Sequence, residues 1–284
     1  MAIWKLEDNI LYYYGTNGGD TVLFSISGLK NLPTINENTT TINGITVSGS
    51  EVTISNANYI DTATQITING EGFTFVLSNN AAADVKVTSP NTTVKGNSYG
   101  VDYSVTAEGF NGAGTFEGDG GNNVLSAKNV KVIGTLELGG DAGDDSISAD
   151  GVTVAGDGNL ELLGYQDTDT VDAKNISVDG GQVDISGLSG NDSVSVKNVA
   201  LTSGGVNISG GSGTDTISVD GVTMAGGNFS ITGNEAADTI SVANVSVNGG
   251  IFQISDSYSL PYDDKISVSK VSLPEVETER RRFF

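Results

Sequence analysis

Residues 187–208 read GLSGNDSVSVKNVALTSGGVNI, and residues 210–231 read GGSGTDTISVDGVTMAGGNFSI. The second segment aligns with the first at an offset of 23 residues, without a gap. Each segment contains three short stretches in which apolar and polar residues alternate, which is typical of β-strands with one buried face. Turn-forming Gly, Asn and Asp separate these stretches. Three strands and three turns in 23 residues predict one coil of a three-sided β-solenoid.

The same pattern recurs from about residue 118 to residue 273. Its most regular position is an aspartate that precedes the first strand of each coil, and the six copies are Asp145, Asp169, Asp192, Asp215, Asp238 and Asp264. From Asn129 to Asn244 the position after this strand holds Asn or Gly, and a glycine pair such as Gly204–Gly205 follows the second strand. Because both residue types tolerate positive φ, we expect each of these columns to form a corner of the coil. The absence of a 3.6-residue period argues against a helical repeat.

The rest of the chain does not keep the 23-residue register, although residues 1–80 are rich in predicted strands. We therefore expect an all-β chain in four parts. These are a β-rich N-terminal cap or assembly region (1–80), irregular early coils (81–117), a regular β-solenoid (118–273) and a basic, aromatic C-terminal tail (274–284).

The ends of a solenoid expose apolar core and unpaired backbone, so they are natural places for contact between subunits. The first residues are aromatic, and the last five read RRRFF in a chain whose net charge is −22. A basic tail could dock on an acidic neighbouring subunit; the alternative is a tail that makes no contact. The candidate assembly residues are Trp4, Tyr12, Arg280, Arg281, Arg282, Phe283 and Phe284.

Composition excludes several classes of function. The excess of 35 acidic over 13 basic residues argues against nucleic acid or an anionic membrane as a partner. The chain contains neither cysteine nor histidine, which removes thiol chemistry, zinc sites and histidine-dependent triads. No apolar run approaches the ~20 residues that span a bilayer. We therefore expect a protein that is not an enzyme and has no membrane span.

Stacked coils would place the six aspartates about 4.8 Å apart, where like charges repel by roughly 1 kcal/mol per pair even in water. Raised pKa values, solvation with counter-ions or a bound hard cation would each relieve this repulsion. The segments Gly187–Ser195 and Gly210–Ser218 resemble the calcium nonapeptide of the repeats-in-toxin (RTX) family, Gly-Gly-x-Gly-x-Asp-x-apolar-x. That resemblance implies a calcium ladder in which the six aspartates and backbone carbonyls supply oxygen ligands.

The sequence departs from the RTX pattern in three ways. One motif occurs per coil rather than two, Asn123 stands in the place of an aspartate, and some copies lack the second and fourth glycines. Gly164–Asp172 and Gly233–Ser241 are two such copies. The alternative interpretation is a solvated acidic corner that glycine turns hold in shape.

More broadly, the chain resembles the β-strand-repeat segments of large bacterial surface and secreted proteins. This resemblance implies a location outside the cell or at its surface. The leading hypothesis is a structural protein, stabilised by calcium, that self-assembles end to end into a homo-oligomer, filament, matrix or surface layer. The alternative is a monomeric calcium-binding adhesin or other binding module whose Ser/Thr-rich face contacts a glycan or ice. A polysaccharide-active β-helix enzyme is the least favoured, because a periodic acidic pattern indicates architecture and a catalytic site is needed only once.

Overall fold

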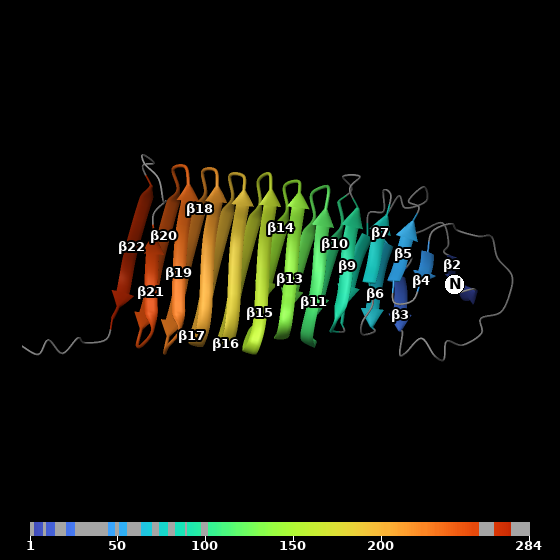
Figure 1. Ribbon diagram of the computed structural model, residues 1–284, viewed down its shortest axis with the longest axis horizontal. Coiled ribbons are helices and arrows are strands. Elements are labelled where there is room, and N and C mark those ends of the chain that lie inside the picture. The colour runs from blue at the N-terminus through green and yellow to red at the C-terminus, as the bar shows by residue number, and fades with distance from the viewer. Residues whose placement is uncertain are drawn as a thin grey trace, which may run out of the picture.

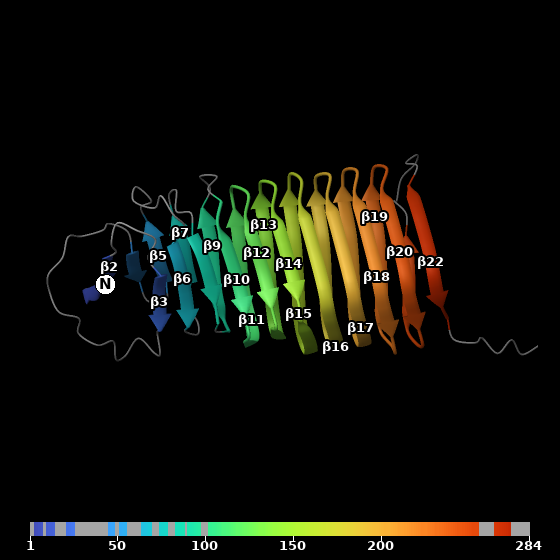
Figure 2. The same ribbon diagram turned by 180° about the vertical axis from the view of Figure 1, so that it is seen from behind.

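The structure is a computed structural model that describes residues 85–88, 90–96, 102–255 and 264–273 in full, and the earlier strands through their backbone pairing. These parts of the chain are all-β, contain no helix and form a parallel β-solenoid of about eight turns. Figures 1 and 2 show the coils stacked along one long axis. The three-sided β-solenoid expected from the 23-residue repeat is confirmed.

The strands follow one another along the chain as β1 (Ile3–Glu7), β2 (Ile10–Tyr14), β3 (Thr21–Ser25), β4 (Ile45–Ser48), β5 (Glu51–Ser55), β6 (Thr64–Asn69), β7 (Thr74–Ser78), β8 (Ala83–Val87), β9 (Thr92–Asn97), β10 (Ser104–Glu108), β11 (Asn111–Asp119), β12 (Val124–Lys128), β13 (Lys131–Ala142), β14 (Ser146–Asp150), β15 (Thr153–Gln166), β16 (Thr170–Ser189), β17 (Ser193–Ser212), β18 (Thr216–Met224), β19 (Asn228–Glu235), β20 (Thr239–Val247), β21 (Ile251–Ser255) and β22 (Lys265–Ser272).

Like residues stack on like residues along the solenoid. In the pairing of β16 with β17, Val171 lies beside Val194. Further along the same pair of strands, Val183 lies beside Val206. Both strands run through two corners of the coil while the parallel ladder continues, with local register shifts at the glycine corner. The columns legible in the sequence are therefore the columns of the ladder.

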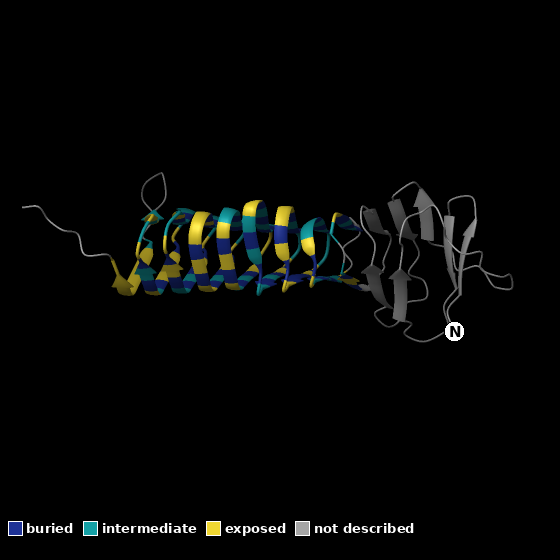
Figure 3. Ribbon diagram, turned by 90° about the horizontal axis from the view of Figure 1, so that it is seen from below, coloured by how far each residue is buried: buried dark blue, intermediate teal, exposed yellow. Residues whose placement is uncertain are grey.

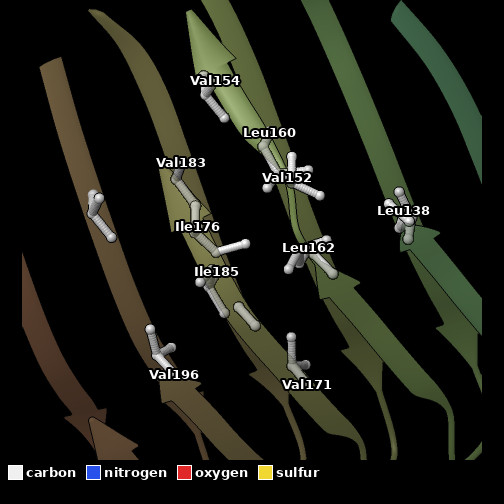
Figure 4. Close-up of a cluster of buried hydrophobic side chains, with 14 of the residues drawn as sticks. Leu138, Val152, Val154, Leu160, Leu162, Val171, Ile176, Val183, Ile185 and Val196 are labelled. Atoms are coloured by element: carbon white, nitrogen blue, oxygen red, sulfur yellow. The ribbon is translucent and has the colours of Figure 1, made fainter. Parts of the chain in front are cut away.

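The core consists of the inward-facing members of each alternating strand. In one coil these are Ile217, Val219, Val222, Met224, Phe229 and Ile231, all between 0 and 1 % exposed. Figure 4 shows the equivalent apolar side chains of neighbouring coils meeting in the interior. Full burial of one such side chain contributes about 1.5–3 kcal/mol, so the repeated strands supply the main driving force for folding.

The Asn/Gly column forms the first corner, as its composition predicted. Asn129, Asn175, Asn198 and Asn244 have φ between 52° and 57°, and Gly151 and Gly221 have φ of 68° and 77°. Side chains of this column also join neighbouring coils, since Asn198 Nδ2 donates a hydrogen bond to Asn175 Oδ1 at 3.1 Å. The glycine-pair corner is left-handed as well, with φ of 92° at Gly204.

Parallel pairing extends further toward the N-terminus than residue 118. Strand β8 pairs with β10 and β10 with β12, which places Val85, Val105 and Leu125 in one column. These coils are 20 residues long, so they fall outside a search for a 23-residue period. Before them, β4 pairs with β5 in antiparallel fashion, and β1 and β2 form an antiparallel pair of their own.

All seven candidate assembly residues lie outside the part of the chain that the structure describes in full. Trp4 and Tyr12 belong to β1 and β2, of which only the backbone pairing is described. The tail 274–284, with Arg280–Arg282 and Phe283–Phe284, is also outside the described residues. Within the described residues, no helix is long and apolar enough to cross a membrane.

Candidate functional site

In the coils that lead to Asp145, Asp169, Asp192, Asp215 and Asp238, the third corner is a loop that begins at a glycine and ends, five residues later, at the repeated aspartate. In the loop Gly187–Asp192, Leu188 and Gly190 have positive φ, of 73° and 155°. In the two loops that lack the second and fourth glycines, the residues at those positions also adopt positive φ, and they are Tyr165, Asp167, Asn234 and Ala236. The sequence departures therefore keep positive φ at both positions, although φ at the fourth position is 72° and 77° in these two loops and between 121° and 155° in the other three, where that position is glycine.

All six repeated aspartates come together in one column, here called the aspartate ladder (Asp145, Asp169, Asp192, Asp215, Asp238 and Asp264). Their side chains turn into the corner, and the first five are between 0 and 3 % exposed. In every rung, Oδ1 accepts a hydrogen bond from the backbone N–H of the equivalent residue in the preceding coil. From Asp145 N onward, these N–O distances are 2.8 Å. The ladder therefore bonds coil to coil through side chains.

The ladder begins at two residues that are not aspartates. Asn123 N donates to Asp145 Oδ1 at 2.6 Å, and Asn123 Oδ1 accepts from Tyr103 N at 3.2 Å. The amide of Asn123 also donates, through Nδ2, to the carbonyl oxygen of Gly121 at 2.9 Å. The hydroxyl of Tyr103 donates to the carbonyl oxygen of Glu117. Sequence reasoning identified Asn123 as a substitution but missed Tyr103, which lies in the 20-residue coils.

The second carboxylate oxygen explains the first glycine of each loop. Oδ2 of Asp145, Asp169, Asp192 and Asp215 is buried and makes no hydrogen bond. A Cβ built on Gly140, Gly164, Gly187 or Gly210 would overlap that oxygen. The loop must therefore begin with glycine, because the carboxylate fills the space that any other side chain would occupy.

Burial dominates the electrostatics of the ladder. Loss of water around the carboxylate raises the pKa of Asp145, Asp169 and Asp215 from 3.8 to about 7, and it also raises the pKa of Asp192. The hydrogen bond from the backbone N–H opposes this rise in pKa. The neighbouring rungs Asp145 and Asp192 add to the rise at Asp169 by charge repulsion.

A second, solvent-exposed hydrogen-bond column runs beside the ladder, one residue earlier in each loop. Thr168 N donates to Asp144 Oδ1 at 3.0 Å, and Thr214 N donates to Asn191 Oδ1 at 2.8 Å. Here the backbone N–H of the following coil is the donor, so the polarity is opposite to that of the aspartate ladder. The sequence signal for this column was a polar residue before most aspartates, and sequence reasoning did not use it.

The calcium shell implied by the RTX resemblance can be compared with this geometry. Calcium takes six to eight oxygen ligands. Each ladder carboxylate already commits Oδ1 to a backbone amide, and Oδ2 packs on the loop glycine. Within the described ranges, no three acidic side chains gather where they could hold a metal ion. The ladder as arranged does not fit a carboxylate-built calcium shell, and we derive no role through calcium.

Comparison with known proteins gives no further guide to the site. No protein-family model, curated protein or solved structure matches the chain. Function must therefore be argued from the solenoid, its ladder and its ends.

Proposed function

We propose that the chain is an extracellular or cell-surface structural protein whose solenoids associate end to end with further copies of the same chain. The proposal rests on one observation, the state of the last described coil. The acidic residues of the whole solenoid are arranged periodically, which supports a structural rather than a catalytic role, because an enzyme needs its catalytic residues at one place only.

The last coil exposes residues that are core everywhere else. Strand β22 pairs with β20, which places Ile266 beside Ile240 and Val268 beside Val242. Ile240 and Val242 are 0 and 1 % exposed, whereas Ile266 and Val268 are 44 and 50 % exposed. Figure 3 shows this end of the stack as mostly exposed residues. Apolar residues that are exposed at core positions favour contact with another apolar surface.

A second copy of the chain is the partner that this end fits best. An edge strand offers backbone N–H and C=O groups for strand addition, and another β-solenoid end supplies the matching geometry. Contacts between unlike ends generate open fibres when the rotation does not close. Docking of the basic tail on an acidic neighbour remains a separate prediction, tested by deleting residues 279–284.

The test compares a variant of the end with a matched variant of the middle. Ile266→Lys with Val268→Lys places two charges on the exposed coil, and Ser195→Lys with Ser218→Lys places two charges on the outer face of central coils. Sedimentation velocity and negative-stain microscopy should show assemblies for the unmodified chain and the central variant, and single rods for the end variant. Single rods for all three proteins at every concentration would contradict the proposal. Samples with millimolar calcium and with chelator test the expectation that calcium promotes assembly.

A second candidate, a binding module, is favoured by one exposed column. Ser146, Thr170, Ser193, Thr216 and Thr239 are all exposed and lie in register on successive coils. A regular row of hydroxyls suits a glycan chain or an ordered layer of water. Glycan binding or thermal hysteresis that is lost on Thr→Val substitution in this row would support this candidate, and the absence of both activities would dismiss it.

A further inference from the structure

We infer that four aspartates of the ladder, Asp145, Asp169, Asp192 and Asp215, carry a proton on Oδ2 in the folded solenoid. Each rung is then a neutral side chain that accepts a hydrogen bond through Oδ1 and presents a donor through Oδ2–H. The inference rests on the ladder alone and holds whether or not the chain assembles into filaments. It also replaces the cation that the nonapeptide resemblance would require.

The first observation is that two oxygen acceptors, the carboxylate Oδ2 and a backbone carbonyl oxygen, lie close to the place that a Cβ on the loop glycine would take. A Cβ built on Gly164 would overlap both Asp169 Oδ2 and the carbonyl oxygen of Gly187 in the next coil. The same holds one coil earlier, where Gly140 faces Asp145 Oδ2 and the Gly164 carbonyl. Asp145 Oδ2 and Asp169 Oδ2 make no hydrogen bond, and a charged oxygen buried beside a carbonyl oxygen without a donor of its own is unfavourable. A proton on Oδ2 converts that oxygen into a donor.

The second observation is that the chain places a donor at this point wherever the rung is not an aspartate. A Cβ built on Gly118 would overlap Asn123 Nδ2 and the carbonyl oxygen of Gly140, so Nδ2 takes the place of Oδ2. One coil earlier, a Cβ built on Gly96 would overlap the hydroxyl of Tyr103. Asn123 and Tyr103 both donate to backbone carbonyls, of Gly121 and Glu117. A neutral hydrogen-bond donor therefore occupies this position in the coils without an aspartate. Aspartate is a neutral donor only when its carboxyl group is protonated.

The described groups around these four rungs include no positive partner for an ionised carboxylate. Those that act on the titration of Asp145, Asp169 and Asp215, through charge or hydrogen bonding, are Asn123, Asp141, Asp144, Asp145, Asp192 and Asp238. Tyr103 lies two coils before Asp145, beyond Asn123, and is itself neutral, because burial raises the pKa of its phenol. Asp167 contacts the backbone of the neighbouring loop through Gly143 N. The titratable groups in this set are all acids, so ionising one rung adds repulsion to desolvation.

The consequence is a dependence of stability on pH with a definite sign. The pKa of Asp145, Asp169 and Asp215 is about 7 in the folded chain and 3.8 ordinarily, so the folded state binds more protons between these values. Stability is therefore full below about pH 4 and falls as pH rises toward 7. Each rung that is protonated only in the folded state changes the unfolding equilibrium constant by about tenfold per pH unit in this window.

The test uses two double variants with the same change in charge. Asp169→Asn with Asp215→Asn replaces two rungs by the neutral residue that the chain itself uses at position 123. Asp157→Asn with Asp179→Asn replaces two exposed aspartates and is the control. Urea unfolding is measured from about pH 4 to about pH 8, and the slope of stability against pH gives the number of linked protons.

We expect the ladder variant to lose about two linked protons relative to the control, and to be more stable than the unmodified chain at pH 8. Equal slopes in the two variants, or an unmodified chain whose stability does not change across the window, would overturn the inference. So would calcium at pH 8 that stabilises the control but not the ladder variant, because a cation would then be the missing partner. If the ladder variant does not fold, the infrared band of protonated carboxyl groups in the folded, unmodified chain at pH 6 decides: its presence supports the inference and its absence refutes it.

Discussion

The early coils and the central coils solve the same packing problem with different chemistry. In the 20-residue coils the inward rung is Tyr103, and at the boundary it is Asn123, whereas in the longer coils it is an aspartate. The rungs from Tyr103 to Asp238 sit against a loop glycine, and the backbone N–H of the preceding coil bonds to the rung side chain from Asn123 onward. Every position in this column therefore needs a side chain of the right shape that can donate a hydrogen bond. Whether the stability of the coil depends on pH is then decided by whether that side chain is Tyr, Asn or Asp.

Truncating the tyrosine at the neutral end of the column should have the largest effect on the free energy of unfolding. Tyr103→Ala removes a buried aromatic ring that is 4 % exposed, together with a hydrogen-bond donor. We expect a loss of about 3–5 kcal/mol in the free energy of unfolding, by analogy with other buried aromatic side chains. The loss should be the same at pH 5 and pH 8, since Tyr103 does not titrate there. Urea denaturation at both pH values measures this loss. A loss that depends strongly on pH would contradict the distinction between neutral and titratable rungs.

Disturbing the contact between the loop glycine and the aspartate of a central coil should have the next largest effect on the free energy of unfolding. Gly187→Ala drives a Cβ into Asp192 Oδ2, and we expect it to cost about 1–3 kcal/mol through overpacking. Asp192→Ala should cost about the same, because it leaves the buried N–H of Asp169 without its acceptor. The double variant should cost less than the sum of the two, because the second substitution removes the clash made by the first. Strict additivity in this double-mutant cycle would contradict the packing described here.

Extending the ladder by one rung should give the smallest effect. Asn123→Asp replaces the neutral boundary residue by a titratable one, while its hydrogen bond from Tyr103 N can remain. We expect little change in stability at pH 4 and a loss of about 1 kcal/mol at pH 8, where burial penalises the charge. The number of protons linked to unfolding should rise by about one. A variant that is as stable as the unmodified chain at pH 8 would show that this rung tolerates charge.

The repeat was predictable from the sequence because stacking forces equivalent residues into columns. The period near 23, the alternating strands and the corner at Asn198 were all legible in the pattern, and the structure confirms them. The start of the parallel ladder was not, because coils such as that between Val85 and Val105 are shorter and fall out of the period. A search for apolar pairs at 20 residues would have found them.

The sequence predicted that the aspartates form a column, but it did not predict that their carboxylates face the interior of the corner. Spacing alone places Asp192 at a corner, and it does not say whether the carboxylate faces solvent, a cation or the interior. That choice depends on the register between coils, which aligns Asp169 N with Asp192 Oδ1. The glycine five residues before each central rung was the available signal, since a buried carboxylate needs the space that glycine leaves. The arrangement of these carboxylates does not fit the calcium shell that the resemblance implied, and the effect of calcium on assembly and the role of the tail are left to the tests given above.

The most direct measurement is a carboxyl carbon NMR titration of the folded, unmodified chain labelled with ¹³C-aspartate. The account predicts a small set of aspartate signals that titrate near pH 7, and it predicts that Asp169→Asn and Asp215→Asn each remove one of them. The remaining aspartate signals provide the internal comparison. If every aspartate, including Asp169 and Asp215, is ionised well below pH 5 in the folded chain without calcium, the ladder is not a column of neutral donors and the account is contradicted.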